Sequence, residues 1–201
     1  MKKRNSKYAL ISVYDKRGVI ELAGQLKKSG YGIIATEGTG RELIKKRIPF
    51  IPCGEISKNP DCFDGHMKTM SFFVESGMLF DRSNDTHVKE AKKFGVKQID
   101  ILICNFFPVK EVVKQLKKSD ITDIVRSFDF GGPTMVRVAA QNFKNVIVVV
   151  DHKDYKNVCN AIISKNITDK LKYDLALKAF KCISDYDNQI VKYLGKNIKS
   201  L

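Results

Sequence analysis

A short segment that combines a carboxylate, two glycines and a proline is the first place in this chain where chemistry is expected. It comprises Asp129, Phe130, Gly131, Gly132 and Pro133, and it leads into an apolar run with helical spacing. Proline suits the first position of a helix, and glycine lets the backbone approach a ligand closely. Because a helix start presents unpaired N–H groups, we expect a polar pocket beside Asp129. A structural alternative stays open, in which the carboxylate only caps the helix.

Hydroxyl, amide and ammonium groups follow the other predicted strands in the same way. Ligands of open α/β sheets bind at the carboxyl ends of the strands, so we expect these groups to share one edge with Asp129. Hydroxyls, backbone amides and lysines suit a phosphate, whereas Asn and Asp suit a heterocycle or an amide. The candidates are Ser12, Lys16, Thr36, Gly38 and Thr39 after the first two strands, His66, Lys68 and Thr69 in a long loop, and Asn105 after a central strand. Each alone has an ordinary structural interpretation, and their common edge favours a site.

The elements that must position these groups alternate between strand and helix. The predicted strands are 8–13, 32–36, 49–51, 99–104 and 145–150. The predicted helices are 19–26, 41–46, 84–94, 109–117, 121–127, a helix after Gly132, 151–163 and 168–194. Residues 37–40 read as a turn and residues 52–82 as an irregular loop. This alternation predicts an α/β fold, with a mostly parallel sheet between two layers of helices.

Length and composition indicate one domain over residues 1–201 that ends with the helix at 168–194. The chain has 201 residues and 43% hydrophobic residues, with no apolar run of membrane-spanning length. We expect no signal peptide, because the apolar run near the start is too short, and hence a cytoplasmic protein. Five cysteines without a C-x-x-C pair indicate free thiols and no structural metal site.

The net charge of +14 raises the alternative of nucleic-acid binding. The lysines are spread along the whole chain, however, and no nucleic-acid motif or aromatic-interleaved basic strand accompanies them. A basic field also attracts small phosphorylated molecules. We therefore predict a small anionic ligand, with neither a nucleic acid nor a membrane as partner.

The motifs occur in the same order as those of a known enzyme family and cover nearly the whole chain. Ala9–Gly18 resembles ALxSVSDKTG, Ala35–Thr39 resembles S-x-G-G-T, Gly65–Thr69 resembles G-R-V-K-T, Cys104–Pro108 resembles x-N-L-Y-P, Phe128–Thr134 resembles I-D-I-G-G-P-T, and Ala139–Asn142 resembles A-A-K-N. Together they resemble the IMP cyclohydrolase domain of the bifunctional purine-biosynthesis enzyme, AICAR transformylase/IMP cyclohydrolase. The resemblance implies a methylglyoxal-synthase-like fold, and we expect the transformylase domain to be absent.

The resemblance also implies an activity and a set of site residues. The activity is closure of a formylated aminoimidazole carboxamide ribonucleotide to IMP in de novo purine biosynthesis, without a cofactor. The implied phosphate-binding residues are Ser12, Lys16, Thr36, Gly38 and Thr39, the catalytic residues are Lys68, Asp129, Thr69, Asn105, His66 and Gln141, and the base-binding residues are Phe130 and Gly131. The implied partners are a purine or imidazole ribonucleotide, a second copy in a homodimer and a separate transformylase.

Several positions depart from the family pattern and leave a second function open. His66 replaces an Arg, Ser71 a His, Phe107 a Tyr and Gln141 a Lys, so polar or cationic groups differ at the reacting end. Glu37 replaces a Gly of the phosphate loop. Loss of one oxyanion partner costs about a hundred- to a thousandfold in rate. The alternative is a divergent homologue that binds a purine nucleotide with weak or no cyclohydrolase activity.

Overall fold

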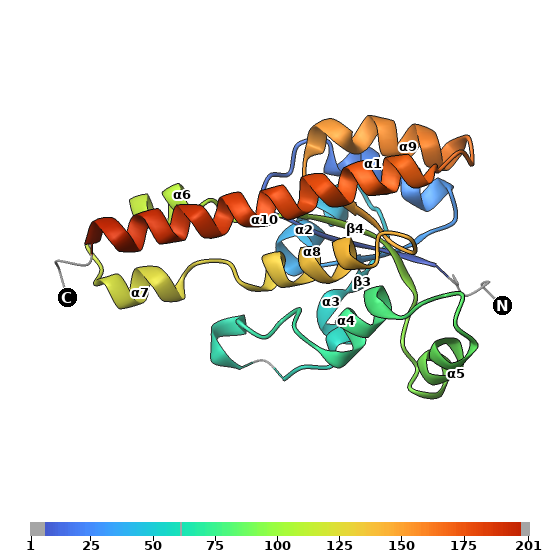
Figure 1. The fold of residues 1–201 in the computed structure, drawn as a ribbon, viewed down its shortest axis with the longest axis horizontal. Helices are drawn as coiled ribbons and strands as arrows, with labels where there is room; N and C mark the ends of the chain where they lie inside the picture. Colours follow the sequence, from blue (N-terminus) through green and yellow to red (C-terminus); the bar gives the residue numbers. More distant parts are fainter. Residues whose placement is uncertain (1–6, 61, 198–201) are drawn as a thin grey trace.

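The computed structural model describes residues 7–60 and 62–197, which form an α/β fold of three layers (Figure 1). Five strands make one sheet in the order β3-β2-β1-β4-β5, and every neighbouring pair is parallel. The strands are β1 (Tyr8–Val13), β2 (Gly32–Ala35), β3 (Ile51–Pro52), β4 (Ile99–Asn105) and β5 (Ile147–Val149). The predicted fold class is confirmed, and the apolar runs of β1 and β4 are those of central strands covered on both faces.

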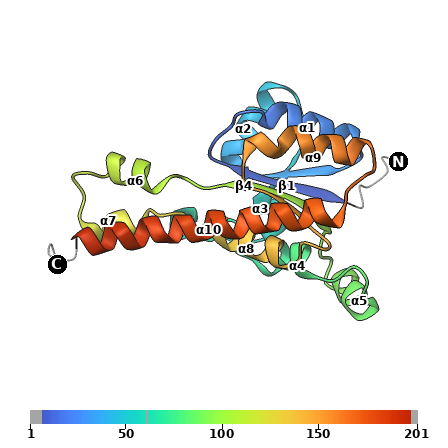
Figure 2. The same ribbon diagram turned by 45° about the horizontal axis from the view of Figure 1, so that its top comes forward.

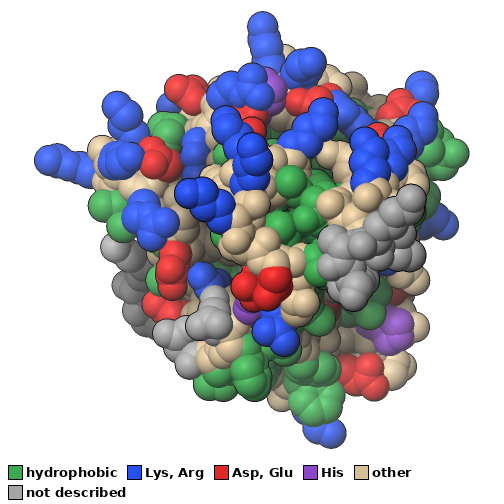
Figure 3. Space-filling model, turned by 90° about the vertical axis from the view of Figure 1, so that its left-hand side faces the viewer, with side chains coloured by type: hydrophobic (Ala, Val, Ile, Leu, Met, Phe, Trp, Pro, Cys, Tyr) green, Lys and Arg blue, Asp and Glu red, His purple; other side chains and the backbone are tan. Residues whose placement is uncertain are grey.

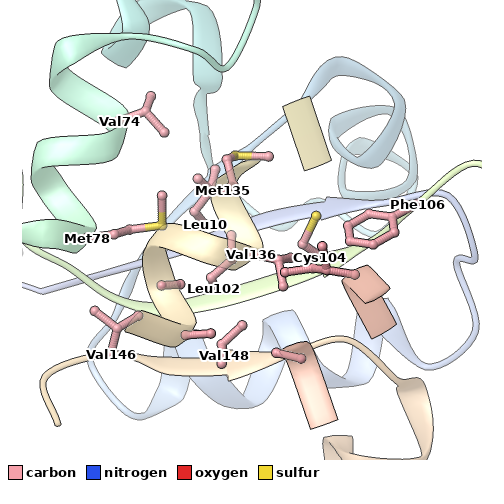
Figure 4. Close-up of a cluster of buried hydrophobic side chains, with 14 of the residues drawn as sticks. Leu10, Val74, Met78, Leu102, Cys104, Phe106, Met135, Val136, Val146 and Val148 are labelled. Atoms are coloured by element: carbon pink, nitrogen blue, oxygen red, sulfur yellow. The ribbon is translucent and has the colours of Figure 1, made fainter. Parts of the chain in front are cut away.

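Helices cover both faces of the sheet (Figures 1 and 2). One face carries α1 (Val19–Lys28), α2 (Glu37–Lys45) and α9 (Tyr155–Ile163), and the other carries α3 (Cys53–Ser57), α4 (Phe72–Leu79), α8 (Gly131–Gln141) and α10 (Asp169–Asn197). Successive residues of a strand point to opposite faces. Ala9 and Ile11 therefore pack towards α1 and α9, whereas Leu10 packs towards α8. Figure 4 shows this second cluster, in which Met135 and Val136 of α8 lie over Leu10 and Leu102.

An arm extends beyond the sheet at the end where the strands finish. It consists of α6 (Val109–Gln115), α7 (Ile121–Arg126) and the C-terminal half of α10 (Figures 1 and 2). With 29 residues, α10 is about 44 Å long at 1.5 Å per residue. Figure 3 looks at this end of the molecule, where Lys and Arg side chains surround hydrophobic ones. No helix in the described residues is long and apolar enough to cross a membrane.

The structure corrects two expectations about the first half of the chain. Residues 37–40 are the first turn of α2 and not a separate turn, because Gly40 lies inside the helix against the ring of Phe50. Residues 52–60 and 62–82 also contain more secondary structure than expected. They contain α3, the short 3₁₀ helix η1 (Phe63–Gly65) and α4, where Val74 and Met78 are buried. The remaining short elements are α5 (Asp85–Lys93) and the 3₁₀ helix η2 (His152–Asp154).

Two glycines inside helices should respond to alanine with opposite signs. A Cβ at Gly77 of α4 would lie 2.6 Å from the carbonyl oxygen of Lys97, whereas a Cβ at Gly24 of α1 meets nothing within 4 Å. We expect Gly77→Ala to lower the free energy of unfolding by about 1–3 kcal/mol, because the backbone must move. Gly24→Ala should raise it by about 0.5–1 kcal/mol through helix propensity. Urea denaturation of both variants measures these free energies. Equal changes in the two variants would contradict the difference in packing around Gly77 and Gly24.

Candidate active site

A cavity of about 450 Å³ opens at the carboxyl ends of β1 and β2. Three further segments close it: the start of α2, the loop that follows η1, and the start of α8. The predicted site residues that line it are Ser12, Thr36, Gly38, His66, Lys68, Thr69, Asp129, Phe130 and Gly131. Residues from four separate parts of the chain therefore meet at the predicted sheet edge.

One end of the cavity is built by the first turn of α2. Thr36 precedes the helix with an extended backbone, and its hydroxyl donates to Ser12 Oγ over 3.3 Å instead of capping α2. The first N–H groups of a helix have no partner within the helix, and its dipole attracts anions. Glu37 and Gly38 line the cavity, and the side chain of Arg41 adds a cation one turn later. This end has the donors and the charge that a phosphate requires.

Another part of the cavity lining is built around the Asp129 carboxylate. Asp129 Oδ1 accepts a hydrogen bond from the Gly132 N–H at 2.9 Å, and the Asp129 N–H donates to the Tyr186 hydroxyl at 2.9 Å. Burial raises the pKa of Asp129, although the N–H groups of Gly132 and Phe107 oppose this shift. The carboxylate therefore does both things expected of it, because it caps the first turn of α8 and also lines the cavity.

The two glycines at the start of α8 leave the room that this arrangement needs. A Cβ at Gly131 would lie 2.8 Å from Thr69 Oγ1, and a Cβ at Gly132 would lie 2.9 Å from Asp129 Oδ2. The helix begins at Gly131, so Pro133 is its third residue and not its first as predicted. Its missing N–H still costs nothing, because the first four N–H groups of a helix lack intrahelical partners.

The loop after η1 brings a cation and a hydroxyl to the cavity. Gly65 has a φ of 76°, a backbone conformation that other residues rarely adopt. Glycine therefore suits the turn that leads into Lys68. Lys68 is exposed while Thr69 is buried. The His66 ring stacks on the Phe130 ring, with centroids 5.9 Å apart and planes 17° apart.

The sequence of these elements matches known families. Residues 18–134 match the model of the MGS-like domain, and residues 139–200 match that of the AICARFT/IMPCHase bienzyme. The chain belongs to the MGS-like domain family. Within that family, the resemblance to the cyclohydrolase part of the bifunctional purine enzyme is confirmed by curated relatives.

Those relatives are called bifunctional purine biosynthesis protein PurH. The protein from Acetivibrio thermocellus is 39% identical over 194 residues, and the one from Ruminiclostridium cellulolyticum is 42% identical over 190 residues. These matches cover 96% and 94% of this chain but 37% of each relative. The crystal structure of ForH is similar as well, with a TM-score of 0.81 and 26% identity over 92% of this chain and 97% of that one.

Four predicted site residues of this MGS-like chain do not line the cavity. Thr39 is fully buried, and its hydroxyl accepts the Val13 N–H at 3.2 Å. Lys16 lies 3.5 Å from that hydroxyl and also donates to the Val13 carbonyl, while burial lowers its pKa. Thr39 and Lys16 therefore connect the start of α2 to the end of β1 without lining the cavity.

Asn105 and Gln141 lie further away. Asn105 Oδ1 accepts hydrogen bonds from the N–H groups of Tyr14 and Asp15 at 2.7 and 2.8 Å, so its amide holds the loop after β1 in place. Asn105 also lines a neighbouring cavity. Gln141 is exposed at the last position of α8, about 15 Å along the helix from its start. Within this chain its side chain does not line the cavity that holds Asp129.

Two contributors to the site were missing from the sequence prediction. Arg41 lines the cavity, and the Tyr186 hydroxyl holds the Asp129 backbone from α10. Arg41 could have been found from its spacing, because residues four apart share a helix face once α2 starts at Glu37. Tyr186 gave no such signal, since it lies 57 residues from Asp129 in the chain.

Proposed function

We propose that this chain closes the purine ring, converting formylated aminoimidazole carboxamide ribonucleotide to IMP. The observation that carries the proposal is that one cavity is lined both by the start of α2, whose N–H groups suit a phosphate, and by Lys68 and Asp129. The PurH relatives are named for purine biosynthesis, which supports the same substrate class. The chain spans about a third of their length, so the proposal concerns the cyclohydrolase step alone.

The phosphate end would fix the substrate. The backbone N–H groups of Glu37 and Gly38, the hydroxyls of Ser12 and Thr36, and the Arg41 guanidinium supply donors for a ribonucleotide phosphate. Both reacting groups belong to one molecule, so holding that molecule in a near-attack geometry provides much of the rate. His66 and Phe130 offer stacked rings beside the place for the heterocycle.

The residues around Asp129 would move the proton and stabilise charge. The carboxamide nitrogen attacks the formyl carbon and gives up one proton, which leaves an oxyanion on the former formyl oxygen. This oxygen then takes up that proton, and it departs as water together with the proton of the former formylamino nitrogen, so that a C=N bond closes the ring. In the proposed mechanism Asp129 takes the carboxamide proton, because its carboxylate lies in the cavity and burial raises its pKa towards the working range of a base. The Lys68 ammonium, with the Thr69 hydroxyl, would stabilise the oxyanion.

A direct assay tests the proposal. The purified chain is supplied with the formylated ribonucleotide, and formation of IMP is followed by absorbance and chromatography. Turnover above the uncatalysed rate is expected. If the folded protein bound IMP or XMP in calorimetry but showed no turnover, the result would contradict cyclisation and support nucleotide binding as the function. This is the alternative that the departures at His66 and Phe107 leave open.

Arg41 offers a test of the phosphate end. We expect Arg41→Ala to raise KM about tenfold or more and to change kcat little, because a cation on the phosphate binds ground state and transition state alike. Lys28→Ala is the matched control, since Lys28 is an exposed cation at the end of α1, outside the residues that line the cavity. An unchanged KM in Arg41→Ala would remove Arg41 from the phosphate site.

The proposed reaction also suggests a cellular location and partners for this chain. We propose that the reaction takes place in the cytoplasm, after a transformylase has added the formyl group. We propose a separate transformylase as the supplier of the substrate and a second copy of this chain as a stable partner.

A further inference from the structure

The loop that carries Lys68 and Thr69 has little regular structure to hold it in place. Residues 66–70, which we call the Lys68 loop, belong to no helix or strand. The turn before them is closed by the Lys68 N–H, which donates to the Gly65 carbonyl at 3.2 Å. Thr69 is buried, whereas Lys68 is exposed. Because few contacts fix such a loop, the position of its ammonium group depends on hydrogen bonds from outside the loop.

The side chain of Asn59 lies outside the Lys68 loop and hydrogen-bonds to its backbone. The Asn59 amide nitrogen donates to the Met67 carbonyl and, over 2.7 Å, to the Met70 carbonyl. These carbonyls belong to the residues directly before Lys68 and directly after Thr69. An asparagine amide has two N–H donors, and this one directs both at the two carbonyls. One NH2 group therefore holds the loop on both sides of two proposed catalytic residues.

Asn59 is itself anchored to a helix of the buried core. It follows α3, in which Cys53 and Ile56 are buried in the same hydrophobic cluster as residues of α8. Lys58 ends α3 in the left-handed region, at a φ of 56°. The Asn59 N–H then lies 3.4 Å from the hydroxyl of Ser57, which is buried. The hydrogen bonds of Asn59 therefore connect the Lys68 loop to a fixed part of the fold.

We propose that Asn59 is a positioning residue for cyclisation, which holds the Lys68 ammonium at the place where the oxyanion forms. This inference rests on the proposed function, in which Lys68 stabilises that oxyanion. Asn59 is not among the described residues that line the cavity, so it acts through the loop. A donor must already be in place when charge develops. A displacement of about 1 Å can cost about a hundredfold in rate, so the two hydrogen bonds matter for kcat.

Steady-state kinetics of two substitutions test the role of the amide. Asn59→Ala removes both donors, and Asn59→Asp keeps the shape but places oxygens opposite the two carbonyl oxygens. Each should lower kcat by about ten- to a hundredfold and leave KM nearly unchanged, because the start of α2 is not altered. Asn157→Ala is the matched control, since Asn157 is an exposed residue of α9 on the other face of the sheet. A native kcat in Asn59→Ala would overturn the proposal.

A double substitution separates positioning of Lys68 from a general structural role. In the Lys68→Ala background, Asn59→Ala should lower kcat by less than about twofold, because the group that Asn59 positions is already absent. A residue that only supports the fold would lower kcat by the same factor in both backgrounds. Equal factors would therefore contradict the proposal.

A measurement without substrate distinguishes failure of this inference from failure of the proposed function. Trypsin cleaves after lysine, and cleavage after Lys68 in the folded chain requires the loop to open. Asn59→Ala should raise the rate of this cleavage about tenfold, as followed by mass spectrometry, because two hydrogen bonds are lost. Cleavage after Lys89, an exposed lysine of α5, should keep its native rate and so report that the rest of the fold is intact.

The two assays together have distinct outcomes. Faster cleavage after Lys68 with a native chain that forms no IMP would show that Asn59 holds the loop and that the proposed function is wrong. An unchanged rate of cleavage after Lys68 would overturn the positioning role of Asn59, whatever the activity of the chain.

Discussion

Replacing Asp129 by Asn should lower the turnover of the formylated ribonucleotide by about a hundred- to a thousandfold, because the base of the proposed reaction is lost. The change is nearly isosteric, and the Asn oxygen can still accept the Gly132 N–H that Asp129 accepts at 2.9 Å. Stability should therefore stay equal or rise, since a neutral amide avoids the burial of a charged carboxylate. Steady-state kinetics and thermal unfolding on the same samples measure both effects.

The sign of the pH dependence follows from the raised pKa of Asp129. As pH falls through this raised pKa, the carboxyl takes up a proton in the native state, so the base and the activity are lost. The unfolded chain binds that proton less readily, so Asp129 contributes native stability on the acid side and loses that contribution as pH rises. Asp129→Asn should remove both trends. A variant that retains native turnover and the native acid limb would show that Asp129 is only a helix cap.

Replacing Lys68 by Ala should lower kcat by about a hundredfold or more and leave the unfolding temperature unchanged, because an ammonium that stabilises the oxyanion acts mainly in the transition state. Lys68 is exposed and lies in the loop after η1, outside the two buried clusters. Kinetics at saturating substrate measure the effect on kcat separately from any effect on binding.

Lys89→Ala serves as the matched control for this variant. Lys89 is an exposed lysine of α5, a helix without buried residues, so the net charge changes equally while the cavity is untouched. If Lys68→Ala kept native kcat, or if both variants lost activity to the same extent, the ammonium would have no specific role in the reaction.

The parts of the fold that sequence analysis predicted are those with a strong one-dimensional pattern. β1 and β4 are apolar runs, and α10 carries a regular amphipathic repeat, so all three appear close to the predicted positions. The helix α4 was missed because its apolar residues, Phe72, Phe73 and Val74, follow one another without the 3.6-residue period. The start of α2 was misjudged because Gly38 and Gly40 suggest a turn unless the contact of Gly40 with Phe50 is known.

The same distinction applies to the site residues, some of which could be placed from the sequence and some of which could not. Residues that directly follow a strand, such as Ser12 and Thr36, could be placed because parallel strands end at one edge. The role of the Asn105 amide could not be predicted, because it depends on the path of the loop at Tyr14 and Asp15. The position of Gln141 also required the structure, since the length of α8 separates it from Asp129.

The hydrogen bond from the Asp129 N–H to the Tyr186 hydroxyl affects when the cavity can form during synthesis of the chain. β1 pairs with β4, about ninety residues later, and Tyr186 comes from the last helix. Contacts so distant in sequence form slowly, and a chain still on the ribosome cannot make them until α10 has emerged. A nascent chain should therefore bind the ligand only after α10 has packed against the rest of the fold. Nascent chains that end before this helix should not bind the ligand.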